Sequence, residues 1–155
     1  MIPKNLLPEG SQYFIAGGWA ACPALAQDRD VFVQTTGDLD NTRAMLLDHL
    51  RAHEFDFEEQ SAQDDHADYA GILSIAKVAK VKIKLATDIH LLVTNGDPSD
   101  IIESFDISTC QVAITSSGRI LRGSGFTAPH IQPVILKDTP TTVERLAKYR
   151  ARFGF

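Results

Sequence analysis

The sequence predicts an α+β fold in which helices flank a mixed β-sheet. Short runs of β-branched and aromatic residues alternate with stretches in which apolar residues recur at helical spacing. Glycine, proline, asparagine and aspartate separate these runs, as they do where turns join strands to helices. We therefore expect several short strands in one sheet, with helices packed against its faces.

Length and composition limit the class of protein. The 155 residues fit a single domain spanning 1–155, because two complete cores would hardly fit in this length. The net charge of −5 argues against a surface that binds polyanions throughout, although a local basic patch is compatible with it. No signal peptide and no apolar run of roughly 18–20 residues is present, so we expect a cytoplasmic protein with no membrane partner. Cys22 and Cys110 are interpreted as buried free thiols.

In the first third of the chain, two predicted strands enclose a glycine turn. The expected elements, in order, are a strand at 13–16, a short helix at 19–26, a strand at 30–35 and a helix at 40–53. Gly17-Gly18 ends the first strand, and Asp38 or Asp40 is a suitable cap for the long helix.

The remaining elements follow a polar loop around 61–68. They are a strand within 72–85, a strand at 89–94, a helix at 98–104, a strand at 105–115, a hairpin strand at 119–121 and a helix from Pro140 through Tyr149. In the last helix we expect Val143, Leu146 and Ala147 to face inward, with Arg145, Lys148 and Arg150 outward. Lys80, Lys82 and Lys84 alternate with apolar residues, which suits a solvated strand face, the guard of an exposed sheet edge or a phosphate guide.

The residues with the clearest chemistry are Asp28 and Asp30. Alternation along a strand directs both side chains to the same side. Two carboxylates so placed repel each other, and a divalent cation such as Mg²⁺ offsets that repulsion. The backbone N–H groups at Gly17-Gly18 are open to close approach by a phosphate. A nucleoside triphosphate with its metal would satisfy both features.

Gly17-Gly18, nine intervening residues and then Asp28-x-Asp30 resemble the signature of the DNA polymerase β-like nucleotidyltransferase superfamily. The resemblance covers roughly Tyr13 to Thr115 and is similar to the minimal catalytic domain. The ending around Thr141–Tyr149 also resembles small phage-encoded members, which would place the protein in the host cytoplasm. The sequence departs from the family at Arg29, where an apolar residue is usual, and at Trp19, where members often carry a small or polar residue.

The resemblance implies a third carboxylate on a later strand beside the first pair, and Asp106 is the candidate. Asp28, Asp30 and Asp106 would then be the catalytic metal ligands for Mg²⁺ or Mn²⁺ in a two-metal reaction, and Gly17 and Gly18 would hold the triphosphate. A nucleoside monophosphate would pass to a hydroxyl acceptor on RNA, tRNA, a protein or a small molecule.

Each of these features also has a structural interpretation. Gly17-Gly18 suits a plain turn, Asp106 suits the end of a helix, and Trp19 suits the core. The basic C-terminal helix is compatible with an RNA contact or with a solvated surface. The alternative functions are a catalytically inactive nucleotidyltransferase fold that binds a host protein or nucleic acid, and a toxin-like transferase that acts on tRNA or a partner protein.

Overall fold

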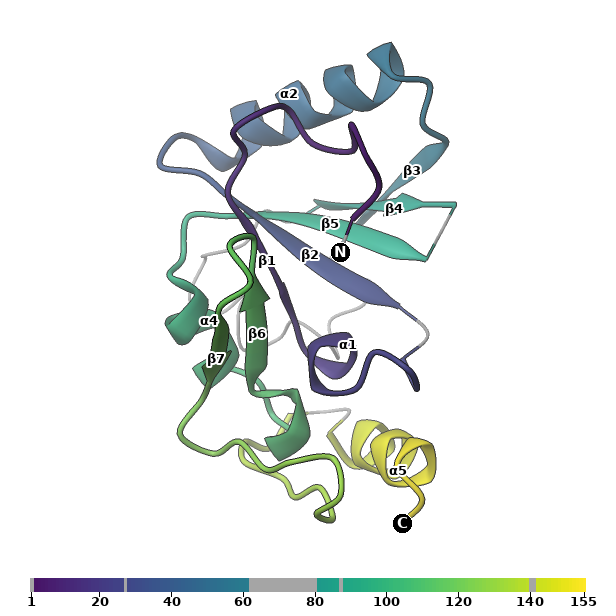
Figure 1. Ribbon diagram of the computed structural model, residues 1–155, viewed down its shortest axis with the longest axis vertical. Helices are drawn as coiled ribbons and strands as arrows, with labels where there is room; N and C mark the ends of the chain where they lie inside the picture. Colours follow the sequence, from purple (N-terminus) through teal and green to yellow (C-terminus); the bar gives the residue numbers. More distant parts are fainter. Residues whose placement is uncertain (1, 27, 62–80, 87, 140–141) are drawn as a thin grey trace.

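The computed structural model describes residues 2–26, 28–61, 81–86, 88–139 and 142–155 (Figure 1). The described elements are β1 (Tyr13–Ala16), α1 (Gly18–Ala21), β2 (Arg29–Gln34), α2 (Leu39–Ala52), β3 (Phe57–Ser61), β4 (Val81–Leu85), β5 (Ile89–Thr94), α4 (Pro98–Glu103), the 3₁₀ turn η1 (Ser108–Cys110), β6 (Val112–Thr115), β7 (Ile120–Arg122) and α5 (Thr142–Arg152).

The described strands form one seven-stranded mixed sheet in the order β3-β4-β5-β2-β1-β6-β7. β2 and β5 run parallel, and the other neighbouring pairs are antiparallel. The predicted α+β class with a mixed sheet is confirmed. None of the helices in the described ranges is long and apolar enough to cross a bilayer.

Alternation along the strands divides the core between the two faces of the sheet. On one face, Val31 and Val33 of β2 pack with Leu46 and Leu50 of α2, and the N-terminal Leu6 joins them. We call this cluster the α2 core; Figure 1 shows α2 and the N-terminal segment on the same side of the sheet.

On the other face, a second cluster contains Phe14, Phe32, Leu92 and residues Ile101 and Ile102 of α4. Even-numbered residues of β2 therefore lie on the α4 face and odd-numbered ones on the α2 face.

A third cluster fixes the C-terminal helix at the end of the molecule beyond α1 (Figure 1). Leu146 and Tyr149 of α5 pack on Ile107 and Cys110 at η1. Phe105 touches both this α5 core and the α4 face, so α5 is joined to the sheet through the segment that follows α4.

The helix expected at 19–26 is shorter than predicted. It ends at Ala21, because Pro23 drives the preceding Cys22 into an extended conformation with φ −153° and ψ 89°. Of the thiols expected to be buried, Cys110 is buried and Cys22 only half-buried. The short strand β3 was not predicted. It is an edge strand, and its Glu58-Glu59 sequence suits a loop as well as an edge that discourages pairing with other chains.

The prediction of a single strand over 105–115 is wrong. Ile107 makes an isolated bridge to Ile135, residues 108–110 form a 3₁₀ turn, and the strand proper starts at Val112. The hydroxyl of Ser108 accepts from the backbone N–H of Val134 at 3.0 Å. Partners in the 127–137 loop thus replace the sheet partners that a continuous strand would need.

The predicted inward face of α5 is also wrong in part. Leu146 is buried as expected, but Val143 is 70% exposed and Ala147 is exposed. The buried stripe instead runs through Thr142, Leu146 and Tyr149. Arg145, expected in solvent, keeps only 15% of its side chain exposed.

The lysine-rich strand is only partly described. β4 lies between β3 and β5, so Lys82 and Lys84 do not guard a sheet edge. Lys80 and the remainder of the predicted strand, 72–80, lie outside the described residues.

Candidate functional site

The site begins at the hairpin that β1 and β2 form around α1. Ala16 of β1 pairs with Asp30 of β2, so the turn at Gly17-Gly18 leaves the sheet directly beside this aspartate. The two glycines are required for different reasons. Gly17 has φ +89°, a conformation that L side chains rarely adopt. A Cβ on Gly18 would lie 3.0 Å from the guanidinium of Arg152 and from the ring of Tyr149, so α5 covers this residue closely.

Asp30 has one partner and is partly open. The register pairs it with His90 of the parallel strand β5, and His90 Nδ1 lies 3.1 Å from Asp30 Oδ1. The Asp30 side chain is 31% exposed and that of His90 is 12% exposed. Within the described part of the chain, Asp30 Oδ2 has no hydrogen-bond partner.

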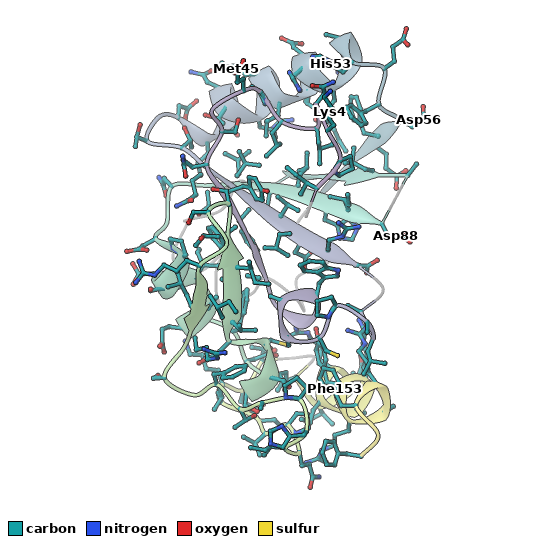
Figure 2. All side chains as sticks on the ribbon, in the orientation of Figure 1. Lys4, Met45, His53, Asp56, Asp88 and Phe153 are labelled. Atoms are coloured by element: carbon teal, nitrogen blue, oxygen red, sulfur yellow. The ribbon has the colours of Figure 1, made fainter. Side chains whose placement is uncertain are left out.

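Two further aspartates lie at the same end of the sheet, where β2 and β5 begin. Asp28 is exposed and stands one residue before β2, where alternation places it on the same face as Asp30. Asp88 stands one residue before β5, and its carbonyl accepts from the N–H of Arg29 at 3.0 Å. It is exposed at the edge where β5 begins, as Figure 2 shows. The starts of β2 and β5 therefore carry an acidic rim.

Asp106 has a different environment. Its side chain is 4% exposed, Thr142 Oγ1 donates to its Oδ2 at 2.9 Å, and Arg145 pairs with its Oδ1. Its carbonyl accepts from the N–H of Leu136 at 2.7 Å. No three acidic, histidine or cysteine side chains in the described ranges form a group able to hold a metal. The structure therefore does not bring Asp106 together with Asp28 and Asp30 as a ligand set.

The two departures from the family pattern contact each other. The guanidinium carbon of Arg29 lies 5.3 Å from the centre of the Trp19 ring, within cation–π range. Both residues are partly buried, and Trp19 packs against the α2 core. The structural interpretation of Trp19 fits this position. Arg29 lies on the α2 face of β2, with the Trp19 ring beside its guanidinium.

His90 is the residue that sequence reasoning missed at this site. It has no metal-type spacing to another histidine, and its relation to Asp30 depends on the parallel pairing of β2 with β5. The available signal was a repeated pattern, Asp28-Arg29-Asp30 and Asp88-Ile89-His90, at the start of two predicted strands. That pattern is informative only if the two strands are known to be neighbours.

Two buried groups near α5 have shifted ionisation. Burial raises the pKa of the Cys110 thiol from 9.0 to about 11, and the nearby charge of Arg145 only partly opposes this. Burial also raises the pKa of Tyr149 well above its ordinary value. Both groups are therefore neutral near pH 7, which suits packing and does not suit a nucleophile.

A separate concave region of about 690 Å³ lies at the opposite ends of β2 and β5. Its lining consists mainly of hydroxyl and amide residues, including Gln34, Thr35 and Asn95. Two of these groups bond within their own turns: Ser11 Oγ donates to the carbonyl of Pro8 at 2.6 Å, and Thr35 Oγ1 accepts from the N–H of Gly37 at 3.1 Å. This region lacks the paired carboxylates of the Asp30 edge.

No protein-family model matches the chain, and no curated protein matches its sequence. The resemblance to nucleotidyltransferases therefore depends on the residues around Gly17 and Asp30 themselves.

Proposed function

We propose that the protein is a Mg²⁺- or Mn²⁺-dependent nucleotidyltransferase of the DNA polymerase β-like kind. It would move a nucleoside monophosphate from a nucleoside triphosphate to a hydroxyl acceptor on RNA, tRNA, a protein or a small molecule. The observation that carries the proposal is the pairing of Ala16 with Asp30. This pairing sets the Gly17-Gly18 turn beside a carboxylate whose second oxygen faces no described hydrogen-bond donor.

The donor set at this edge fits Mg²⁺. This cation keeps several waters and is commonly held by one or two carboxylates together with substrate phosphates. Asp28 and Asp30 supply two carboxylates on one face, and both are accessible. A bound divalent cation would neutralise developing charge on the phosphates and activate the attacking hydroxyl. A complete cage of protein ligands is not needed for that chemistry.

The chain's own residues would mainly position the substrate. At Gly17 the substrate could come close to the backbone, since nothing lies within 4 Å of the place where a Cβ would be, while its N–H donates to the carbonyl of Val112 at 3.1 Å. His90 holds Oδ1 of Asp30 and so turns the other carboxylate oxygen toward the ligand. Phosphoryl-type transfers depend mostly on positioning and charge stabilisation, so this division of roles is sufficient in principle.

In this proposal Asp106 keeps the α5 core in place and is not a metal ligand. Its carboxylate is already bound by Thr142 and Arg145, and burial would make the loss of either contact costly. The metal would therefore be shared by Asp28, Asp30 and the triphosphate, which departs from the three-carboxylate arrangement that the family resemblance implied.

The direct test is label transfer. The wild-type protein is incubated with Mg²⁺ and each α-labelled nucleoside triphosphate in turn, together with total RNA, purified tRNA and cell protein. We expect transfer of label from one triphosphate into one acceptor class. The variant with Asp28→Ala and Asp30→Ala should lose it, and Asp56→Ala, which removes an exposed aspartate elsewhere, should keep it. Absence of transfer to every acceptor would remove the main support for catalysis.

A binding module with the same fold is the second candidate. It is favoured by the absence of a three-carboxylate group in the described residues and by the Arg29–Trp19 contact, where family members usually differ. A biological effect that survives Asp28→Ala with Asp30→Ala would favour this function over catalysis. Loss of the effect in a variant that stays folded would rule it out.

A further inference from the structure

The C-terminal helix presents a group of cations around a single aromatic ring. The guanidinium carbon of Arg152 lies 5.1 Å from the centre of the Tyr149 ring, and Lys148 Nζ and the guanidinium carbon of Arg145 each lie 5.8 Å from it. Like charges this close repel one another, so the group gains stability from any anion that binds between them.

The three cations are not equivalent. Arg145 is paired with Asp106, so its charge is already compensated. Within the described part of the chain, no carboxylate forms an ion pair with Lys148 or Arg152. Lys148 is exposed and Arg152 is half-buried. These two residues therefore carry uncompensated positive charge in a protein whose net charge is −5.

The position of Arg152 connects this charge to the candidate site. A terminal nitrogen of its guanidinium lies 3.0 Å from where a Cβ of Gly18 would be. Gly18 follows the turn that starts beside Asp30. Figure 1 shows α1 between the sheet and α5, so the helix approaches the turn from the side opposite the strands. Arg152 therefore reaches the residue that follows the turn beginning beside Asp30.

We propose that Arg152 and Lys148 of α5 bind the triphosphate of the nucleotide at the Gly17-Gly18 turn. This inference rests on the proposed function, since it assigns the second half of the same site. Arginine binds phosphate through a planar fork of donors and is less strongly hydrated than lysine. The Tyr149 ring keeps the guanidinium of Arg152 oriented, which lowers the entropy lost on binding. Arg152 is therefore the main contact and Lys148 the weaker one.

The test is a calorimetric titration of the full chain with ATP and, separately, with inorganic triphosphate, each in the presence of Mg²⁺. Arg152→Gln should weaken both ligands about tenfold, as expected for the loss of a charge-assisted hydrogen bond. Arg152→Lys should recover part of this loss, and Lys148→Gln should have a smaller effect. Arg122→Gln is the matched control, because Arg122 also stacks on an aromatic ring, at 5.5 Å from Phe126, on β7.

The outcomes separate this inference from the proposed function. Equal affinity of wild type and Arg152→Gln for both ligands, with ATP binding intact, would overturn the inference and leave the proposed function standing. Tight binding of inorganic triphosphate that Arg152→Gln abolishes, with no label transfer from any nucleotide, would uphold the inference and count against the function. If single-stranded RNA binding falls in Arg152→Gln while ATP binding does not, α5 is an acceptor surface and the inference is wrong.

Discussion

Asp30 and Asp106 were both expected to be metal ligands, but the fold gives them opposite environments. Asp30 lies at the start of the central strand β2, where its side chain is 31% exposed and has His90 as its partner. Asp106 is 4% exposed and is bound by Thr142 and Arg145 of α5. A carboxylate with a free oxygen at an accessible edge can receive a cation. A carboxylate that is buried and fully paired instead holds two parts of the fold together.

This contrast explains why two acids of the same type should respond differently to mutation. Removal of the charge of Asp30 should change the free energy of unfolding little, because solvent already screens that charge. Its main effect should be on what the protein can bind. Charge removal at the buried position leaves an arginine without its partner in a poorly hydrated environment.

Asp106→Ala should lower the free energy of unfolding by about 3–5 kcal/mol, since it leaves the charge of Arg145 buried and uncompensated. Asp30→Ala should change stability by about 1 kcal/mol or less, because its site is partly exposed. Urea unfolding followed by circular dichroism measures both changes. Equal destabilisation by the two substitutions would contradict the contrast between the open and the buried aspartate.

Thr142→Val should destabilise the protein by about 1–3 kcal/mol through the loss of a buried hydrogen-bonding group. Its Oγ1 donates to Asp106 and accepts from the N–H of Thr139 at 2.8 Å, so one substitution leaves two polar groups unsatisfied. Combined with Asp106→Ala, the two effects should be less than additive, because both remove the same contact. Full additivity in the urea data would show that the two residues act independently.

Stability should fall at alkaline pH. The Cys110 thiol has its pKa raised from 9.0 to about 11 in the folded protein, so the folded state holds this proton more tightly than the unfolded chain. The resulting stability is present below about pH 9.0 and is lost as the pH rises through about 11. Tyr149, whose pKa is also raised, adds to the same trend. Urea midpoints measured across this range should decline, and Cys110→Ala should decline less steeply; a slope that Cys110→Ala leaves unchanged would exclude the thiol as a cause.

The Arg29–Trp19 contact should give the smallest effect. A double-mutant cycle with Arg29→Ala and Trp19→Ala is expected to yield a coupling energy of about 0.5–1 kcal/mol, as for cation–π pairs that remain partly exposed. The same cycle applied to Arg51 and Phe57, whose guanidinium carbon and ring centre are 5.6 Å apart, provides a reference. A coupling energy of zero would mean that Arg29 and Trp19 contribute to the free energy of unfolding independently of each other.

Most of the fold was predictable where local signals agree. Residues 13–16, 89–94 and 98–103 have the expected structure because a β-rich run or a proline-started helix is bounded by clear turn residues. Asp38 caps α2 as predicted, with its carboxylate accepting from the N–H of Asn41 at 3.1 Å. The prediction of a single strand over 105–115 failed because tertiary contacts of Ser108 outweigh the strand-like composition of this segment.

The candidate site was predictable only along the sequence. Gly17, Gly18 and Asp30 meet because β1 and β2 form a local hairpin, whose pattern is readable from residues 13–34. His90 and Arg152 reach the same region from distant parts of the chain, through the β2–β5 pairing and the packing of α5. The outward position expected for Arg145 was wrong, because periodicity does not reveal that this residue turns inward to pair with Asp106.

We propose that Asp30 binds the metal, whereas Asp106 holds the fold together. Electron paramagnetic resonance of Mn²⁺ with a non-hydrolysable nucleoside triphosphate tests it in wild type, Asp30→Asn and Asp106→Asn, with folding of each variant checked by circular dichroism. We predict that Asp30→Asn loses bound Mn²⁺ while remaining as stable as wild type, and that the folded fraction of Asp106→Asn binds Mn²⁺ normally. Mn²⁺ binding that survives Asp30→Asn but disappears in folded Asp106→Asn would contradict these two roles.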